Sequence, residues 1–104
     1  KEREQYREAL DAFEQGLALD AERTDILNLA GFCHFKLGEH EKAVERFAAI
    51  LALDPSSAID YANMAVNYRA MGQIQKALHY YQQALAIDPA IEFARQHLEE
   101  ILGR

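Results

Sequence analysis

Hydrophobic residues recur at three- and four-residue intervals along most of the chain, the spacing that places them on one face of an α-helix. Gly38 and Gly72 stand where two of these stretches end, and glycine readily adopts the left-handed conformation that stops a helix. Asp54-Pro55 and Asp88-Pro89 stop two others, because the residue before proline avoids the helical region and proline donates no hydrogen bond. The pattern therefore predicts helices over residues 4–19, 25–37, 41–53, 59–71, 75–87 and 92–104.

The helical stretches repeat at one fixed interval, without an insertion or a deletion. The interval from Ala9 to Ala43 is also the interval from Ala43 to Ala77. A fixed period of this kind indicates units that each bury too little apolar surface alone and stack on their neighbours to form one core. Other positions that keep the period are Phe13, Phe47 and Tyr81, then Asp20, Asp54 and Asp88, and also Gly38 and Gly72.

A 34-residue unit with two helices, an A-x3-F pattern in the second helix and a later proline resembles the tetratricopeptide repeat (TPR). The resemblance implies an all-α fold, a right-handed α-solenoid of antiparallel helix pairs with about six helices. It makes residues 1–104 a single TPR array, with the end of a truncated repeat at 1–23, full repeats at 24–57 and 58–91, and a capping helix at 92–104.

Several local contacts follow from the repeat. Gly31 and Ala65 are small, so each first helix is expected to approach Ala43 or Ala77 of its second helix closely. In the last segment the equivalent residue is Glu99, which fits such a seam badly and favours a cap, so the array is expected to end near Arg104. At the other end, the partner of the helix at 4–19 would lie upstream of residue 1, which predicts an adhesive edge.

The ends of the helices also carry predictions. Ser57 is expected to be an N-cap, with Asp60 three residues later, and Thr24 or Asp25 is expected to cap the preceding repeat. The recurring segments LALDA, LALDP and LAIDP are expected to finish each second helix and to pack it against the next one. The leucines concerned are Leu17 and Leu19 in the first segment and Leu51 and Leu53 in the second.

Composition narrows the classes of function. Half of the residues are hydrophobic, and 17 acidic against 11 basic residues give a net charge of −6. This charge disfavours binding to nucleic acid or to an anionic membrane surface. No apolar run approaches the ~20 residues of a membrane span, so direct membrane insertion is not expected. The single cysteine, Cys33, excludes an internal disulfide, is expected to be buried, and suits a reducing compartment such as the cytoplasm.

No pattern for catalysis is present in the chain. His34 and His40 fall where such repeats place packed aromatic residues, and no histidine has a cysteine or glutamate at the spacing of a zinc site. The carboxylates fall mainly on solvent-facing helix positions, and no phosphate-binding glycine loop or nucleophile motif occurs. We therefore expect neither an enzyme nor a bound cofactor or metal.

The TPR resemblance implies a concave groove, lined by the first helices, that binds a peptide or segment of a partner protein. Carried over by position, the peptide-binding residues would be Asn28, Leu29, Phe32, Phe35, Lys36, Asn63, Val66 and Arg69, with Phe93 and His97 at the far end. Phe32 and Phe35 either form an apolar anchor pocket in this groove or turn into the core, and the sequence leaves both open.

The leading functional hypothesis is a protein–protein interaction scaffold whose partner the sequence does not identify. Capture of a partner's C-terminal carboxylate is not expected, because Phe32, Phe93 and His97 replace the polar and basic residues that some TPR domains use for it. Two alternatives remain. The chain could self-associate as a homo-oligomer through its uncovered N-terminal helix, or it could serve as a docking or regulatory arm of a larger enzyme.

Overall fold

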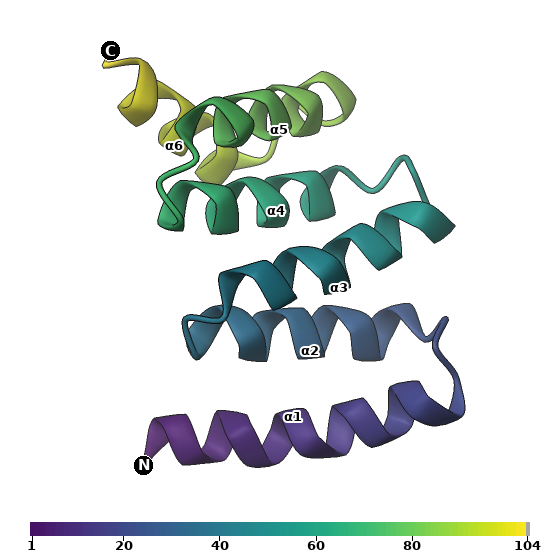
Figure 1. Cartoon of the computed structure of the whole chain (residues 1–104). Helices are drawn as coiled ribbons and strands as arrows, with labels where there is room; N and C mark the ends of the chain where they lie inside the picture. Colours follow the sequence, from purple (N-terminus) through teal and green to yellow (C-terminus); the bar gives the residue numbers. More distant parts are fainter. Residues whose placement is uncertain (104) are drawn as a thin grey trace.

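A computed structural model describes residues 1–103, which form six α-helices and no strands (Figure 1). Consecutive helices run antiparallel and stack in chain order, so that α1 lies at one end of the molecule and α6 at the other (Figure 1). This arrangement confirms the predicted all-α solenoid. The helices are α1 (Glu2–Leu19), α2 (Thr24–Lys36), α3 (His40–Leu53), α4 (Ala58–Ala70), α5 (Ile74–Ile87) and α6 (Glu92–Leu102).

The helices stop where the sequence predicts. Gly38 and Gly72 have φ angles of 76° and 78°, the left-handed conformation expected after α2 and α4. Asp54 and Asp88 leave the helical region at the ends of α3 and α5, with φ of −138° and −137°. Because both stop signals keep the period of the repeat, the turns recur with the helices.

Each recurring aspartate also organises the turn that follows it. The backbone N–H groups of Glu22, Ser56 and Ala90 donate to the side chains of Asp20, Asp54 and Asp88, at N···O distances of 3.0, 3.1 and 3.0 Å. These are Asx turns, in which a short carboxylate accepts a hydrogen bond from the residue two positions later. The aspartate therefore redirects the chain even after α1, where Ala21 replaces the proline of the other two copies.

The predicted helix caps are partly wrong. The N-cap of α2 is Arg23, whereas Thr24 and Asp25 already belong to the helix. Ser57 does stand at the N-cap of α4, but its hydroxyl donates to the carboxylate of Asp60 and to no backbone group. The Asx turn at Asp20 explains the first difference, because it leads the chain directly into α2 at residue 24.

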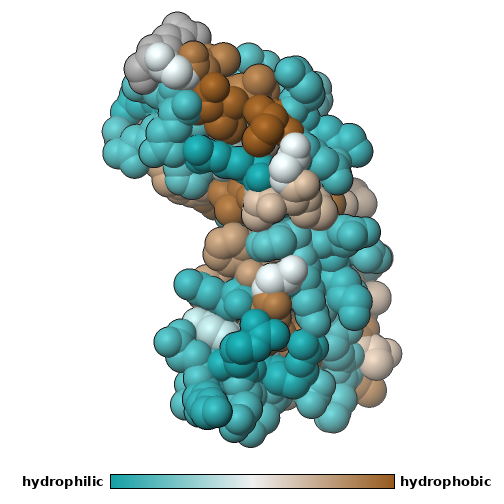
Figure 2. Space-filling view, turned by 60° about the vertical axis from the view of Figure 1, so that its left-hand side comes forward, coloured by the Kyte–Doolittle hydropathy of each residue, from teal (hydrophilic) through white to brown (hydrophobic). Residues whose placement is uncertain are grey.

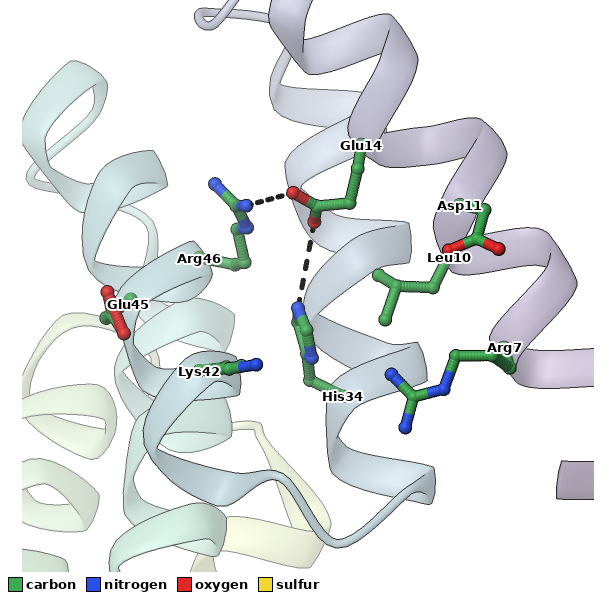
Figure 3. Close-up of a pocket in the computed structure, with 8 residues that line it drawn as sticks. All are labelled: Arg7, Leu10, Asp11, Glu14, His34, Lys42, Glu45 and Arg46. Carbon is green, nitrogen blue, oxygen red and sulfur yellow. Dashed lines mark hydrogen bonds and ion pairs between the residues drawn. The ribbon is translucent and has the colours of Figure 1, made fainter.

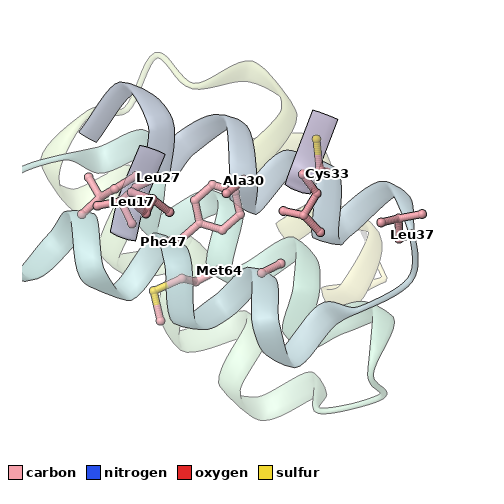
Figure 4. Packing of buried hydrophobic residues seen from close by; sticks show 10 residues of the cluster. Leu17, Leu27, Ala30, Cys33, Leu37, Phe47 and Met64 are labelled. Carbon is pink, nitrogen blue, oxygen red and sulfur yellow. The ribbon is translucent and has the colours of Figure 1, made fainter. Parts of the chain in front are cut away.

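The core depends on a close approach between α2 and α3. A Cβ atom added to Gly31 would lie 2.7 Å from Cζ of Phe47, well inside van der Waals contact. Phe47 is buried with Leu27, Ala30 and Cys33 (Figure 4). Gly31 therefore makes room for the Phe47 ring, whose atoms lie nearest to it, and the predicted close approach to Ala43 stays a prediction. The corresponding pair of the next repeat, Ala65 and Tyr81, shares the second buried cluster.

Two tyrosines connect the two buried clusters, and a third extends their stack. The rings of Tyr68 and Tyr80 stack with centroids 5.4 Å apart and an angle of 9° between their planes, and Tyr61 stacks on Tyr80 at 6.2 Å. Tyr68 and Tyr80 pack against both clusters. Apolar contact is therefore continuous across the seam between the repeats, as the stacking of a solenoid requires.

In each recurring leucine segment, only the first of the two large apolar residues packs against the core. Leu17 is buried and Leu51 is half-buried, whereas Leu19, Leu53 and Ile87 are 91%, 43% and 44% exposed. Two residues correspond to about 200° around a helix, so the second position faces away from the core when the first faces it. The expectation that Leu19 and Leu53 pack against the next helix is therefore wrong.

The N-terminal end of the stack differs from the expected edge. Leu19 is the only exposed large apolar residue of α1, so this helix offers no adhesive apolar face. Apolar side chains gather instead at the upper, C-terminal end of the face seen in Figure 2. Glu99 is exposed, as a capping role for α6 requires, although that role stays a prediction and Arg104 lies outside the described residues. In residues 1–103, no helix has the length and apolar character needed to cross a bilayer.

Gly31→Ala should destabilise the protein, although alanine is the better helix former. Overpacking against Phe47 should cost roughly 1–3 kcal/mol, which exceeds the ~1 kcal/mol gained in helix propensity. Gly16→Ala is the matched control, because its new Cβ would meet only the side chain of Ile26, with Cδ1 nearest at 3.0 Å. Urea denaturation should show a lower free energy of unfolding for Gly31→Ala and an equal or higher one for Gly16→Ala. A loss of equal size in both variants would contradict this account of the seam.

Candidate functional site

The first helices of the repeats jointly line a cleft of about 350 Å³. Helices α2, α4 and α6 contribute its walls, and α3 contributes the ring of Phe47 from below the surface. The full lining is Asn28, Phe32, Phe35, Phe47, Asn63, Val66, Asn67, Phe93 and His97. Because its walls come from helices of three successive units of the repeat, the cleft exists only in the folded array.

The cleft is mainly apolar, and Phe32 is its most exposed aromatic residue. Phe32 is 45% exposed and meets Tyr6 of α1 edge-on, with ring centroids 6.0 Å apart. Phe35 lines the cleft and also packs against the buried cluster beneath it. The alternatives left open by the sequence are therefore both realised: Phe32 faces the cleft, and Phe35 belongs to cleft and core together.

Two polar residues of the cleft are held by the protein itself. Asn67 is buried, donates through Nδ2 to the carbonyl of Asn63 at 2.8 Å, and lies 2.8 Å from Nδ1 of His40 through Oδ1. Nδ1 of His97 lies 2.7 Å from the hydroxyl of Tyr81. Burial raises the pKa of Tyr81 to about 12, so this hydroxyl stays protonated at any physiological pH. These bonds fix the two side chains as walls of the cleft.

The structure brings together five of the eight predicted peptide-binding residues: Asn28, Phe32, Phe35, Asn63 and Val66. The other three do not line the cleft. Nζ of Lys36 lies 5.5 Å from the ring centroid of Phe32 and 5.9 Å from that of Phe35. Arg69 bonds to Glu100 at 2.9 Å, and Leu29 is exposed outside the lining of the cleft. Whether any of the eight binds a peptide stays a prediction.

Sequence reasoning missed Phe47 and Asn67 as cleft residues. The period of the repeat places Phe47 in the core, where it also lies. Asn67 carries a signal, because the equivalent residues of the neighbouring repeats, Cys33 and Ile101, are apolar. A polar residue at a position that the other repeats fill with apolar ones has a local partner or a role outside the core, and for Asn67 that partner is His40.

A second, polar cavity lies between α1 and α3, over α2 (Figure 3). Its floor is His34, which is buried and lies 2.8 Å from Glu39 through Nδ1 and 3.7 Å from Glu14 through Nε2. Arg46 pairs with Glu14, and Arg7 pairs with Glu39 at 2.7 Å. The network joins the first three helices through charge and leaves His34 packed, as the sequence predicts.

The titration of Glu39 follows from this network. The hydrogen bond from Arg7, and next that from His34, lower the pKa of Glu39 to about 2. Cys33, one residue before His34, is buried as predicted, and burial raises the pKa of its thiol. Among residues 1–103, no group of three His, Cys, Asp or Glu side chains is placed to hold a metal ion.

Comparison with known proteins identifies the family. The sequence profile of the tetratricopeptide repeat matches residues 22–90, which is more than half of the chain. The chain belongs to the tetratricopeptide-repeat family. This membership agrees with the period of the sequence and with the helix pairs described above. Comparison with curated protein sequences gives no significant match.

Solved TPR structures share the fold. The first TPR domain of human RPAP3 superposes with a TM-score of 0.88 at 20% identity, covering 98% of this chain and 80% of that one. MamA from Desulfovibrio magneticus RS-1 gives 0.86 at 24% identity, covering 93% and 55%. YrrB, described as a TPR protein with an unusual peptide-binding site, gives 0.85 at 28%, covering 90% and 48%. The present chain thus spans about half the length of the MamA and YrrB chains.

Glu39→Gln should make the protein less stable near neutral pH but not in strong acid. A carboxylate with a lowered folded-state pKa stabilises the fold above its unfolded pKa of about 4.3, and the benefit disappears as the pH falls toward 2. We expect a difference of about 1 to 2 kcal/mol at pH 6, allowing for solvent screening. Urea denaturation at several pH values should show that the difference in free energy of unfolding between the variant and the unmodified protein shrinks between about pH 4 and pH 2. The neighbouring exposed Glu41→Gln is the control, and an equal, pH-independent effect of both variants would contradict the assignment.

Proposed function

We propose that this TPR array acts by binding a segment of a partner protein in the cleft between α2, α4 and α6. The observation that carries the proposal is the exposed Phe32 beside Phe35, Val66 and Phe93 in one concave surface. Apolar concavities with a few convergent polar groups are the usual form of ligand sites. Asn28 and Asn63 supply amide groups that can bond to the backbone of a bound segment.

The comparisons support this class of partner. A structure of the first TPR of Spaghetti (RPAP3) contains an HSP90 peptide, SRMEEVD. YrrB is described as a TPR protein with an unusual peptide-binding site. The present cleft favours a different peptide chemistry. Its lining holds no lysine or arginine, and Arg69 is paired with Glu100. We therefore expect an apolar side chain, and not an acidic tail, to contribute most of the binding energy.

Binding is also a better proposal than catalysis. His97 is the one titratable side chain in the lining of the cleft, and its Nδ1 already lies against the hydroxyl of Tyr81. An acid–base mechanism needs a second titratable group within reach of the first. Use as a docking arm of a larger enzyme would engage the same cleft, whereas self-association through α1 gains no support from its polar outer surface.

Phe32→Ala should weaken binding of a peptide selected on the immobilised protein from a random display library. Truncating an aromatic anchor typically loses of the order of 1–3 kcal/mol, which corresponds to a roughly 10- to 100-fold higher Kd. Ile87→Ala is the matched control, because Ile87 is exposed to the same degree and lies on α5, outside the cleft. Isothermal titration calorimetry measures both.

Thermal denaturation must accompany this measurement, because Phe32 also touches Tyr6. A folded Phe32→Ala variant that binds the peptide as tightly as the unmodified protein would contradict the proposal. So would a library that yields no binder to the unmodified protein. Phe35→Ala is a less suitable first variant, since Phe35 packs against the core and its loss confounds binding with stability.

A further inference from the structure

His97 stands apart from the other polar residues that line the cleft. Asn67 has both polar atoms of its side chain engaged within the protein, at 2.8 Å each. The side-chain amides of Asn28 and Asn63 each offer donors and an acceptor, so they suit either polarity in a bound segment. His97 is held on one side only, through Nδ1, by the hydroxyl of Tyr81 at 2.7 Å. Its second ring nitrogen, Nε2, therefore decides what His97 offers to a ligand.

Two departures from the repeat pattern meet in this hydrogen bond. Tyr81 stands where the two preceding units have phenylalanine, Phe13 and Phe47. His97 stands where the preceding repeat has Asn63. Because the repeat accepts phenylalanine at the position of Tyr81, packing alone does not require a hydroxyl there. Tyr81 is 0% exposed, so this hydroxyl would be costly to bury without a partner, and its partner is His97.

The direction of the hydrogen bond follows from the surroundings of the hydroxyl. Burial raises the pKa of Tyr81 to about 12, against the opposing positive charge of Arg69, so the hydroxyl keeps its proton. Arg69 offers donors and no acceptor, and its guanidinium is paired with Glu100. Nδ1 of His97 is thus the acceptor that the structure gives to the hydroxyl proton. A neutral imidazole has one donor and one acceptor nitrogen, so the ring hydrogen of His97 lies on Nε2.

Nε2 of His97 is accessible to a ligand. It has no hydrogen-bond partner within residues 1–103, and yet it is not one of their solvent-shielded polar atoms without a partner, which are Oε1 of Glu14 and Oδ1 of Asp60. The ring lines the cleft and meets Phe93 edge-on, with ring centroids 5.7 Å apart. His97 therefore presents one fixed donor in mainly apolar surroundings, where a hydrogen bond is stronger than in water.

We propose that Nε2 of His97 donates a hydrogen bond to a main-chain carbonyl of the bound segment. His97 thereby fixes the polarity that the segment must present at the α6 end of the cleft. The inference rests on the function proposed above and deepens it by assigning a specificity-determining residue. A carbonyl is the matching acceptor, because a carboxylate would enter the apolar lining without a lysine or arginine to pair with it.

NMR of the imidazole nitrogens tests the tautomer in the unbound protein. Long-range ¹H–¹⁵N spectra, recorded with the histidines in their neutral form, distinguish the ring nitrogen that carries the hydrogen from the one that does not. We expect the hydrogen of His97 on Nε2, because Nδ1 accepts from Tyr81. A hydrogen on Nδ1 in the unmodified protein would overturn this inference and leave the function proposed above intact.

A thioamide scan tests the bond to the segment. The peptide is the tightest binder selected from a random display library on the unmodified protein, and each analogue has one carbonyl oxygen replaced by sulfur, a weaker acceptor. At one position near the apolar anchor, this replacement should raise Kd about 3- to 10-fold, the effect of one neutral hydrogen bond. His97→Phe should bind the unmodified peptide more weakly by a similar factor and should show no further loss with that analogue.

Three further variants make the result specific. His97→Gln places an amide donor near the position of Nε2 and should regain part of the thioamide effect. His79→Phe removes an exposed imidazole of α5, outside the cleft, and should keep the full effect. Thermal denaturation checks folding, because His97→Phe leaves the buried hydroxyl of Tyr81 without its acceptor. Should that variant not fold, the double variant His97→Phe/Tyr81→Phe replaces it, since it contains no such hydroxyl.

The outcomes separate this inference from the proposed function. A thioamide effect of equal size in the unmodified protein and in the His97→Phe variant would show that His97 only satisfies Tyr81, and would overturn the inference. A scan in which no position near the anchor affects Kd would do the same. In both cases a weaker Phe32→Ala variant would still support the proposed function. A library that yields no binder would overturn both.

Discussion

The contact between the ring of Phe47 and the backbone of Gly31 determines the geometry on which the rest of the structure depends. A large aromatic side chain on the second helix of a repeat fits only because the facing residue of the first helix is small. Tyr81 and Ala65 are the corresponding pair in the next repeat. Phe47 also lines the cleft, and the buried Tyr81 holds His97 in its wall. The packing of the array therefore also determines the shape of the cleft.

Much of this fold could be predicted from the sequence because the information is periodic. Left-handed glycines, Asp-Pro stops and the constant spacing of the repeat each act locally, so they locate helices without knowledge of the tertiary structure. Side-chain direction at helix ends is harder to predict, and Leu53 is exposed because two nearby leucine positions do not form one packing unit. Position alone would put Lys36 and Arg69 in the cleft, whereas contacts with Phe32 and with Glu100 hold them outside it.

The informative positions are those at which the repeats disagree. Asn67 replaces the apolar residues found at the equivalent positions and incurs little desolvation penalty, because the Asn63 carbonyl and His40 are its hydrogen-bond partners. Asp60 likewise replaces apolar residues, but one oxygen of its carboxylate has no partner. The first departure is therefore fully satisfied inside the chain, whereas the second is only partly satisfied, by the hydroxyl of Ser57. Sequence comparison between repeats finds both positions, and only the structure separates them.

The most direct test of the binding account is to map the contact surface in solution. Amide chemical shifts of the ¹⁵N-labelled protein can be followed by NMR during titration with the tightest peptide from the display selection. The account predicts that the largest changes fall on α2, α4 and α6 around Phe32, Val66 and Phe93. Changes confined to α1, α3 and α5, or to the polar cavity around His34, would contradict it.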